Sequence, residues 1–85
     1  MKNFRDAVQQ HMEREKWIVF VVKDDLVDLF CIRHGQTKLI RARGNGHGHL
    51  YQNIEHKLRN LQRKCGMRVL VAKVNGDNEI WFMRI

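Results

Sequence analysis

The sequence predicts a single α/β domain in which a mixed central sheet is flanked by helices, with the element order αβββαββ. The first observation is length, because 85 residues suffice for one hydrophobic core. The second is that helical and strand periodicities alternate along the chain. The third is a nearly continuous apolar segment, Met67 to Val74, after a long amphipathic helix. A strand of this kind is expected to be central and covered on both faces.

The first half of the chain is expected to form one helix and three strands. Residues 3–16 repeat apolar side chains on one helical face, and Asn3 is suited to cap the first turn. Residues 17–22 and 26–33 are rich in β-branched and aromatic side chains and are separated by a polar turn, which indicates two strands. A third strand is expected over residues 38–43.

Two details of these strands follow from the pattern. In the second strand, alternate residues are expected to share a face. One face carries Leu26, Asp28, Phe30 and Ile32, and the other carries Val27, Leu29 and Cys31. The turn into the third strand consists of His34, Gly35 and Gln36.

The second half is expected to contain one helix and a hairpin. Apolar residues at helical spacing predict an amphipathic helix from Leu50 to Cys65, and Gly66 is suited to end it. Residues 67–74 then form a strand. Residues 75–78 contain an Asn-Gly turn that leads into the last strand, residues 79–85.

Charge is concentrated in the middle of the chain. The formal net charge is +7. Between Leu29 and Asn75 there are ten Lys and Arg residues and one acid, Glu55, whereas both flanking segments are slightly acidic. A one-sided positive field favours polyanions through phosphate contacts and counterion release. The distribution therefore predicts nucleic-acid binding, against the alternative that the basic surface serves only solubility.

Composition excludes several classes. With 44% hydrophobic and 29% charged residues, the chain matches ordinary globular domains. The longest apolar run, Trp17 to Val22, is too short to cross a bilayer, and residues 1–16 lack the pattern of a signal peptide. We therefore expect an intracellular, cytoplasmic protein that does not enter a membrane. Cys31 and Cys65 lie in segments that look buried, so we expect reduced core thiols.

Two arginines, Arg41 and Arg43, lie one residue apart at the end of the third predicted strand. Alternation puts both on one face of that strand. The following loop, Gly44 to His49, alternates glycine with asparagine and histidine but lacks the spacing of a P-loop or a dinucleotide-binding loop. Its glycines allow close approach to a nucleic-acid backbone. The alternative is a loop without function.

The order of elements, with the residues on it, resembles the PD-(D/E)XK nuclease superfamily, which has the restriction-endonuclease-like fold, and within it the archaeal-type Holliday junction resolvases and the VRR-NUC nucleases. Asp28-Leu29 stands where the family has its aspartate, and the strand Val69 to Ala72 follows Gly66 as in the family. Where the family carries Glu-x-Lys, this chain carries Arg41-Ala42-Arg43. The resemblance covers essentially the whole chain and implies a restriction-endonuclease-like αβββαββ fold.

The resemblance also implies what has changed at the site. In the family, the aspartate and glutamate hold a divalent cation that activates water. Arginine neither binds a cation nor acts as a base near neutral pH. The hypothesis is that Arg41 and Arg43 form a metal-free phosphate clamp where the ion once sat. The alternative is that both arginines pair with Asp28 or Glu55, or reach solvent.

Further nucleic-acid contacts are expected around this strand and on the polar side of the long helix. The full candidate set is Arg41, Arg43, His47, His49, Tyr51, Lys57, Arg59 and Arg63. Tyr51 is the aromatic candidate for base stacking. Trp17 and Trp81 sit in predicted strands and are expected in the core.

A rearranged catalytic site is the main alternative. Members of the superfamily sometimes carry a metal-binding carboxylate on the helix after the third strand, and Glu55 is the only acid there. Asp28 and Glu55, with Asp24, Asp25 or Gln52 as further candidates, would then form the catalytic site and hold Mg²⁺ or Mn²⁺, with Arg43 in the lysine's place. Glu55 can equally pair with Arg59, four residues on. If catalysis is lost, no cofactor is expected.

The sequence therefore leads us to expect a protein that binds nucleic acid, most readily duplex or branched DNA, by shape and phosphate contact, with catalysis lost. Resolvases of the resembled family act as dimers, so a homodimer is expected. An interpretation from a different class is a protein-interaction module built on a decayed nuclease scaffold.

Overall fold

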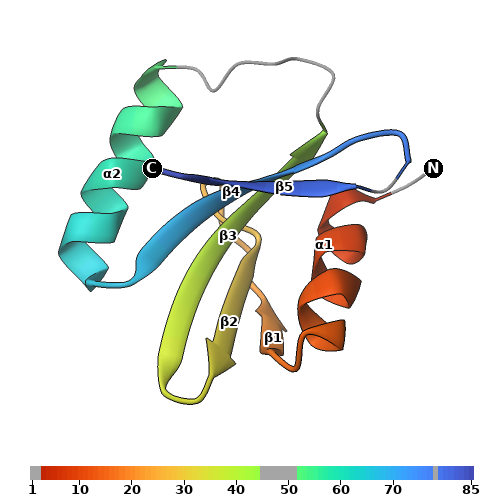
Figure 1. Cartoon of the computed structure of the whole chain (residues 1–85). Helices are drawn as coiled ribbons and strands as arrows, with labels where there is room; N and C mark the ends of the chain where they lie inside the picture. Colours follow the sequence, from red (N-terminus) through yellow and green to blue (C-terminus); the bar gives the residue numbers. More distant parts are fainter. Residues whose placement is uncertain (1–2, 45–51, 78) are drawn as a thin grey trace.

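The chain folds into a five-stranded sheet with one helix on each face (Figure 1). The structure is a computed structural model that describes residues 3–44, 52–77 and 79–85. In chain order the elements are α1 (Phe4–Arg14), β1 (Ile18–Val21), β2 (Leu29–Arg33), β3 (Gln36–Gly44), α2 (Gln52–Cys65), β4 (Arg68–Val74) and β5 (Ile80–Arg84). The predicted α/β class and the order αβββαββ are confirmed.

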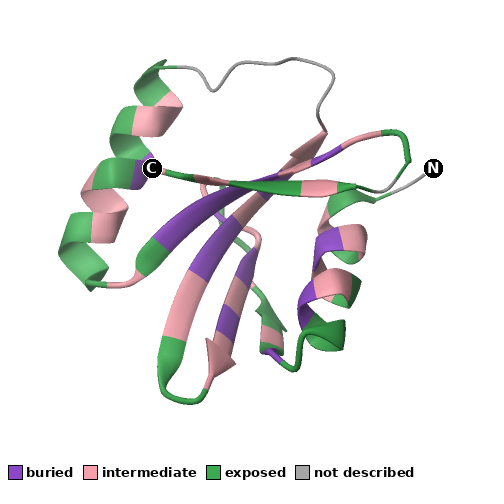
Figure 2. Cartoon of the chain, in the orientation of Figure 1, coloured by how far each residue is buried: buried purple, intermediate pink, exposed green. Residues whose placement is uncertain are grey.

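The strands lie side by side in the order β1-β2-β3-β4-β5. Neighbouring strands are antiparallel except β3 and β4, which are parallel and are joined by the crossover helix α2. Strand β4 therefore has a neighbour on each side, and it is buried along most of its length (Figure 2). The expectation that residues 67–74 are covered on both faces is confirmed.

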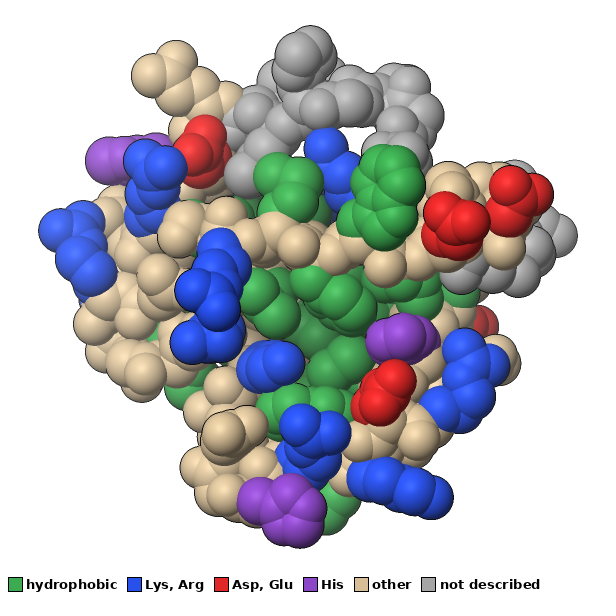
Figure 3. All heavy atoms as spheres, viewed as in Figure 1, with side chains coloured by type: hydrophobic (Ala, Val, Ile, Leu, Met, Phe, Trp, Pro, Cys, Tyr) green, Lys and Arg blue, Asp and Glu red, His purple; other side chains and the backbone are tan. Residues whose placement is uncertain are grey.

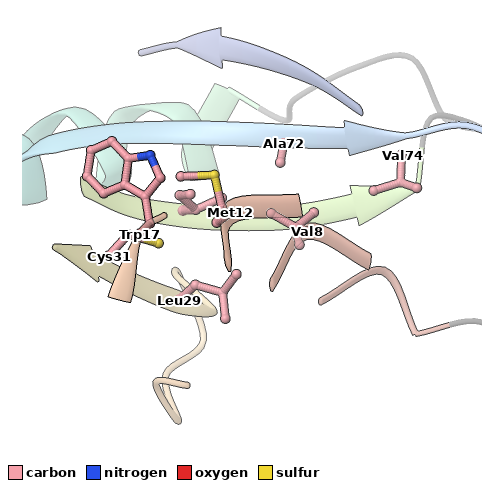
Figure 4. Packing of buried hydrophobic residues seen from close by; sticks show 9 residues of the cluster. Val8, Met12, Trp17, Leu29, Cys31, Ala72 and Val74 are labelled. Atoms are coloured by element: carbon pink, nitrogen blue, oxygen red, sulfur yellow. The ribbon is translucent and has the colours of Figure 1, made fainter. Parts of the chain in front are cut away.

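Two apolar clusters fill the space between the sheet and the helices. The α1-side cluster is centred on Val8, Met12, Trp17, Leu29, Cys31, Ile40, Ala42, Ala72 and Val74 (Figure 4). The α2-side cluster is centred on Val27, Leu39, Leu58, Val69 and Val71. Residues of β3 and β4 alternate between the two clusters, as strand geometry requires.

Helix α1 begins and ends with well-formed caps. At its start, the Asn3 side chain accepts a hydrogen bond from the Arg5 N–H at 2.9 Å, which confirms the predicted N-cap. At its end, the N–H groups of Lys16 and Trp17 donate to the carbonyls of Glu13 and Met12. This is a Schellman motif, and it brings Lys16 to a φ of 71°.

We expect the Lys16→Gly variant to be more stable than the parent chain by about 0.5–1 kcal/mol, because a side chain in the left-handed region is strained. Urea unfolding followed by circular dichroism measures the difference. Gly66, after α2, has a φ of 70° and supplies the matched control. Gly66→Ala is expected to lower stability by about 1 kcal/mol. Equal stability of all three chains would contradict the assignment of strain to these two positions.

The β2–β3 connection is tighter than expected. Arg33 pairs with Gln36, so the turn consists of His34 and Gly35 alone. Their φ angles are 50° and 77°, as a two-residue hairpin with the right-handed strand twist requires. Strand β3 consequently begins at Gln36, two residues before the predicted start.

Strand β2 begins at Leu29, three residues later than the predicted Leu26. Val27 was expected to share a face with Leu29 and Cys31. Instead it belongs to the α2-side cluster, whereas Leu29 and Cys31 belong to the α1-side cluster. The prediction was wrong because alternation holds only inside a regular strand, and the chain bends before Asp28.

Two side chains predicted in the core are exposed. Trp81 lies on the edge strand β5 with 56% of its surface accessible, and Cys65 ends α2 in an exposed position. Trp17 and Cys31 are buried as predicted, and burial raises the pKa of the Cys31 thiol to about 11. Both cysteines are free. Neither described helix, α1 nor α2, is long and apolar enough to cross a membrane.

Candidate nucleic-acid interface

Strand β3 places Arg41 and Arg43 on the side of the sheet that faces α2. Its residues Ile40 and Ala42 belong to the α1-side cluster and Leu39 belongs to the α2-side cluster, so alternation sends both arginines toward the α2 side. At Arg41 and Arg43 strand β3 is paired with β4 alone, because its pairing with β2 ends at Ile40. Their common face was predicted from the sequence, and the structure confirms it.

The Asp28 side chain accepts hydrogen bonds from β3 just beyond the last backbone pair between β2 and β3. Its carboxylate oxygen Oδ2 accepts from the Ala42 N–H at 2.7 Å and from Arg43 Nη1 at 2.9 Å. Ala42 is buried, and its N–H has reached the point where β2 no longer runs alongside β3. The carboxylate thus replaces a missing main-chain acceptor and is neutralised by a guanidinium at the same oxygen.

Arg43 is paired and still partly exposed. Its side chain retains 44% of its accessible surface, whereas that of Asp28 retains 21%. A half-exposed ion pair contributes modestly to stability, but its forked guanidinium has donors for a second anion as well. The alternative expected from the sequence, that an arginine pairs with Asp28, is therefore confirmed for Arg43.

Arg41 makes a different set of contacts. Its Nη1 donates to the backbone carbonyls of Asp25 and Leu26, at 2.8 and 2.9 Å. Among the described residues its buried Nε finds no hydrogen-bond partner. Burial lowers the pKa of Arg41, and the neighbouring Arg43 lowers it further, while Asp28 opposes the shift. Arg41 therefore links the segment before β2 to β3 through hydrogen bonds. The arrangement also keeps the positive charges of Arg41 and Arg43 close together, which is unfavourable.

Glu55 does not join Asp28. Its carboxylate pairs with Arg59 at 2.6 Å, one turn further along α2, so the alternative expected for Glu55 is confirmed. No group of three or more His, Cys, Asp and Glu side chains that could hold a metal ion occurs in the described part of the chain. The residues proposed for a rearranged catalytic site, Asp28 and Glu55, each have an arginine as partner instead.

Helix α2 exposes the remaining basic candidates. Lys57, Arg59 and Arg63 all lie on its accessible side, while Leu58 points into the α2-side cluster. The Arg63 guanidinium donates to the side-chain carbonyl of Asn60. Helix α2 covers the side of the sheet to which Arg41 and Arg43 point, so these five predicted contacts lie on the same side of the sheet. The predicted contacts His47, His49 and Tyr51 lie outside the described residues.

No protein-family model matches this chain, and no curated protein is detectably similar to it in sequence.

The backbone groups that complete this site were not predictable from the sequence. The carbonyls of Asp25 and Leu26 and the N–H of Ala42 carry no residue-type signal, because every amino acid except proline has the same backbone groups. Asp28 itself offered a clue, since an acid next to a buried strand is expected to find donors nearby.

Proposed function

We propose that this chain is a nucleic-acid-binding domain of the restriction-endonuclease-like fold in which the catalytic metal site has been lost. The ligand is duplex or branched DNA, bound through its phosphates and its shape. The observation that carries the proposal is the position of Arg43. Its guanidinium lies 2.9 Å from the carboxylate that the resembled nucleases use to hold a cation, so the positive charge there belongs to the protein.

A guanidinium beside Asp28, in place of a metal ion, favours the binding of an anion. A divalent cation needs free carboxylate oxygens, and Asp28 Oδ2 is already shared by two donors. A phosphate needs forked donors and a local excess of positive charge. The Arg43 guanidinium is partly exposed, and Arg41, although bonded to the carbonyls of Asp25 and Leu26, places a second positive charge close to it. Neutralising Asp28 with Arg43 removes the negative charge that would repel a phosphate.

The charge distribution supports a polymeric ligand. The cations of β3 and those of α2 lie on the same side of the sheet, and Glu55 is the one acid between Leu29 and Asn75. Such contacts fix the position of a nucleic-acid backbone but do not read its sequence. We therefore expect affinity to depend strongly on salt and weakly on base sequence.

We expect Arg43→Gln to weaken DNA binding several-fold and to lower the salt slope of log K by about 1, because one phosphate contact is lost. Glutamine keeps an amide donor near Asp28, which limits the damage to the fold. The measurement is a fluorescence-anisotropy titration of linear and four-way-junction DNA at two salt concentrations. Arg14→Gln, at the exposed end of α1, is the matched control for the loss of one charge. If both variants kept the parental slope, the proposed interface would be refuted.

The homodimer stays a prediction. A second copy would present a second set of basic side chains, which suits the two-fold symmetry of a four-way junction. The stoichiometry of protein on junction DNA, measured by light scattering of the purified complex, tests it. One chain per junction at saturation would contradict the dimer.

A further inference from the structure

A second basic cluster lies on the opposite face of the sheet, the one that α1 covers in part. It surrounds an open hollow of about 340 Å³. The cations around it are Arg33, Lys38, Arg68 and Arg84. In Figure 3, blue side chains gather along one side of an apolar hollow. We call this set the α1-side basic hollow.

Four strands of the sheet bring these cations and their apolar surroundings together. Lys38 on β3 lies directly beside Arg68 on β4 in the parallel register. Two residues further along β4, Leu70 lies opposite Arg84 on β5. Arg33, at the end of β2, has the same parity as Cys31 and so faces the same side. None of the four positions is near the others in sequence except Arg33 and Lys38.

Trp17 lines the hollow, and two of the cations lie over its ring. The Arg33 guanidinium lies 4.4 Å and the Lys38 ammonium 4.5 Å from the centre of its ring. Arg33 also donates to the Glu15 carbonyl at 2.8 Å. Because the ring is only 5% exposed and packs in the α1-side cluster, these contacts keep both charges at the mouth of the hollow.

This arrangement is unfavourable without a counter-charge. Like charges directly opposite each other in a sheet destabilise it. Burial lowers the pKa of Lys38, and the nearby Arg68, Arg33 and Arg84 lower it further. Glu15 is the one acid lining the hollow, and within residues 3–44, 52–77 and 79–85 none of the four cations forms a salt bridge.

Apolar side chains also line the hollow, and they favour an anion that has an apolar part. Met12, Leu70 and Phe82 line it beside the cations. Phe82 is 38% exposed, and its ring lies 5.7 Å from the ring of His11. A bare inorganic anion would leave these walls uncovered, whereas a nucleotide places a base on apolar surface and its phosphates on cations.

We propose that the α1-side basic hollow binds a nucleotide, with Lys38, Arg68 and Arg84 holding its phosphate groups and Phe82 contacting its base. Guanidiniums suit phosphate because their forked donors match its oxygens. The volume lies at the lower end of the range for small-ligand pockets. The site faces away from Arg43, so it goes beyond the DNA interface and does not depend on it. A free nucleotide and the phosphorylated end of an oligonucleotide offer the same chemistry.

The test uses the fluorescence of Trp17, read in the Trp81→Phe background because Trp81 is exposed. ATP, inorganic pyrophosphate and short single strands with 5′-phosphate or 5′-hydroxyl ends are the probes. Saturable binding of ATP, tighter than that of pyrophosphate, is expected. The double variant Arg68→Gln/Arg84→Gln is expected to lose about tenfold or more in ATP affinity. Both residues are exposed, so the fold should persist.

A matched control separates this site from general charge. Lys57→Gln/Arg63→Gln removes two exposed cations from α2 and is expected to leave ATP affinity within about twofold. Tighter binding of the 5′-phosphate strand than of the 5′-hydroxyl strand would assign the site to nucleic-acid ends, and binding of ATP alone would assign it to free nucleotides. The proposal is overturned if neither ATP nor a 5′-phosphate strand binds, or if both double variants lose affinity equally. Arg43→Gln should leave ATP binding unchanged, so failure of either proposal is recognisable by itself.

Discussion

Replacing Asp28 with alanine is expected to destabilise the fold by about 2–4 kcal/mol, because a charged acceptor serving two donors is lost. The buried N–H of Ala42 would lose its partner where β2 no longer runs alongside β3. Arg43 would lose its ion pair at the same time. Urea unfolding, followed by circular dichroism and by tryptophan fluorescence, measures the change. Asp28→Asn is the control, since its amide oxygen can still accept from Ala42 and should retain part of the stability.

The Asp28→Asn variant also distinguishes a DNA-binding protein without catalysis from a metal-dependent nuclease. If Arg43 serves as a phosphate contact, Asp28→Asn removes a negative charge beside it, and DNA affinity should stay equal or rise. If Asp28 and Glu55 instead formed a metal site, the parent chain would cut DNA in Mg²⁺ or Mn²⁺ and the variant would not. A gel that reports binding and cleavage together distinguishes the two. Metal-dependent cleavage by the parent, abolished in Asp28→Asn, would overturn the proposed loss of catalysis.

Leu58→Ala is expected to lower stability by about 3 kcal/mol, since a fully buried leucine leaves a cavity. Leu58 is 0% exposed, and it is the one fully buried side chain of α2. Its partners in the α2-side cluster, Val69 and Val71, belong to β4. Chemical denaturation measures the loss. The neighbouring Lys57→Ala, on the exposed side of α2, should stay within about 0.5 kcal/mol of the parent.

The position of Leu58 adds a functional consequence. Helix α2 carries three of the predicted DNA contacts on its exposed side. If Leu58→Ala loosens the helix, DNA affinity should fall together with stability, and both should recover as the temperature is lowered. A variant as stable as the parent would show that α2 is held by contacts other than the buried leucine.

The elements themselves were predictable because their signals are local. The N-cap at Asn3, the glycine after α2 and the apolar run of β4 each depend on a few neighbouring residues. Strand boundaries were less predictable. Whether β2 begins at Leu26 or Leu29 depends on how long a neighbouring strand runs alongside it, and that is a tertiary property.

Burial at the edges also depends on the whole fold. Trp81 looked like a core residue by type, yet β5 is an edge strand whose α2 side leaves it accessible. Position in the sheet, which a single strand does not reveal, decides whether an aromatic side chain is covered.

By itself the sequence determined the α/β class, the order of the elements, the excess of positive charge in the middle of the chain and the common face of Arg41 and Arg43. Only the tertiary structure decided which charged side chains lie next to one another. It paired Asp28 with Arg43 and Glu55 with Arg59, and it gathered Arg33, Lys38, Arg68 and Arg84 around Trp17. The physical reason is that periodicity fixes the face on which a side chain lies, whereas strand order and register fix its neighbours, and electrostatic interactions depend on distance.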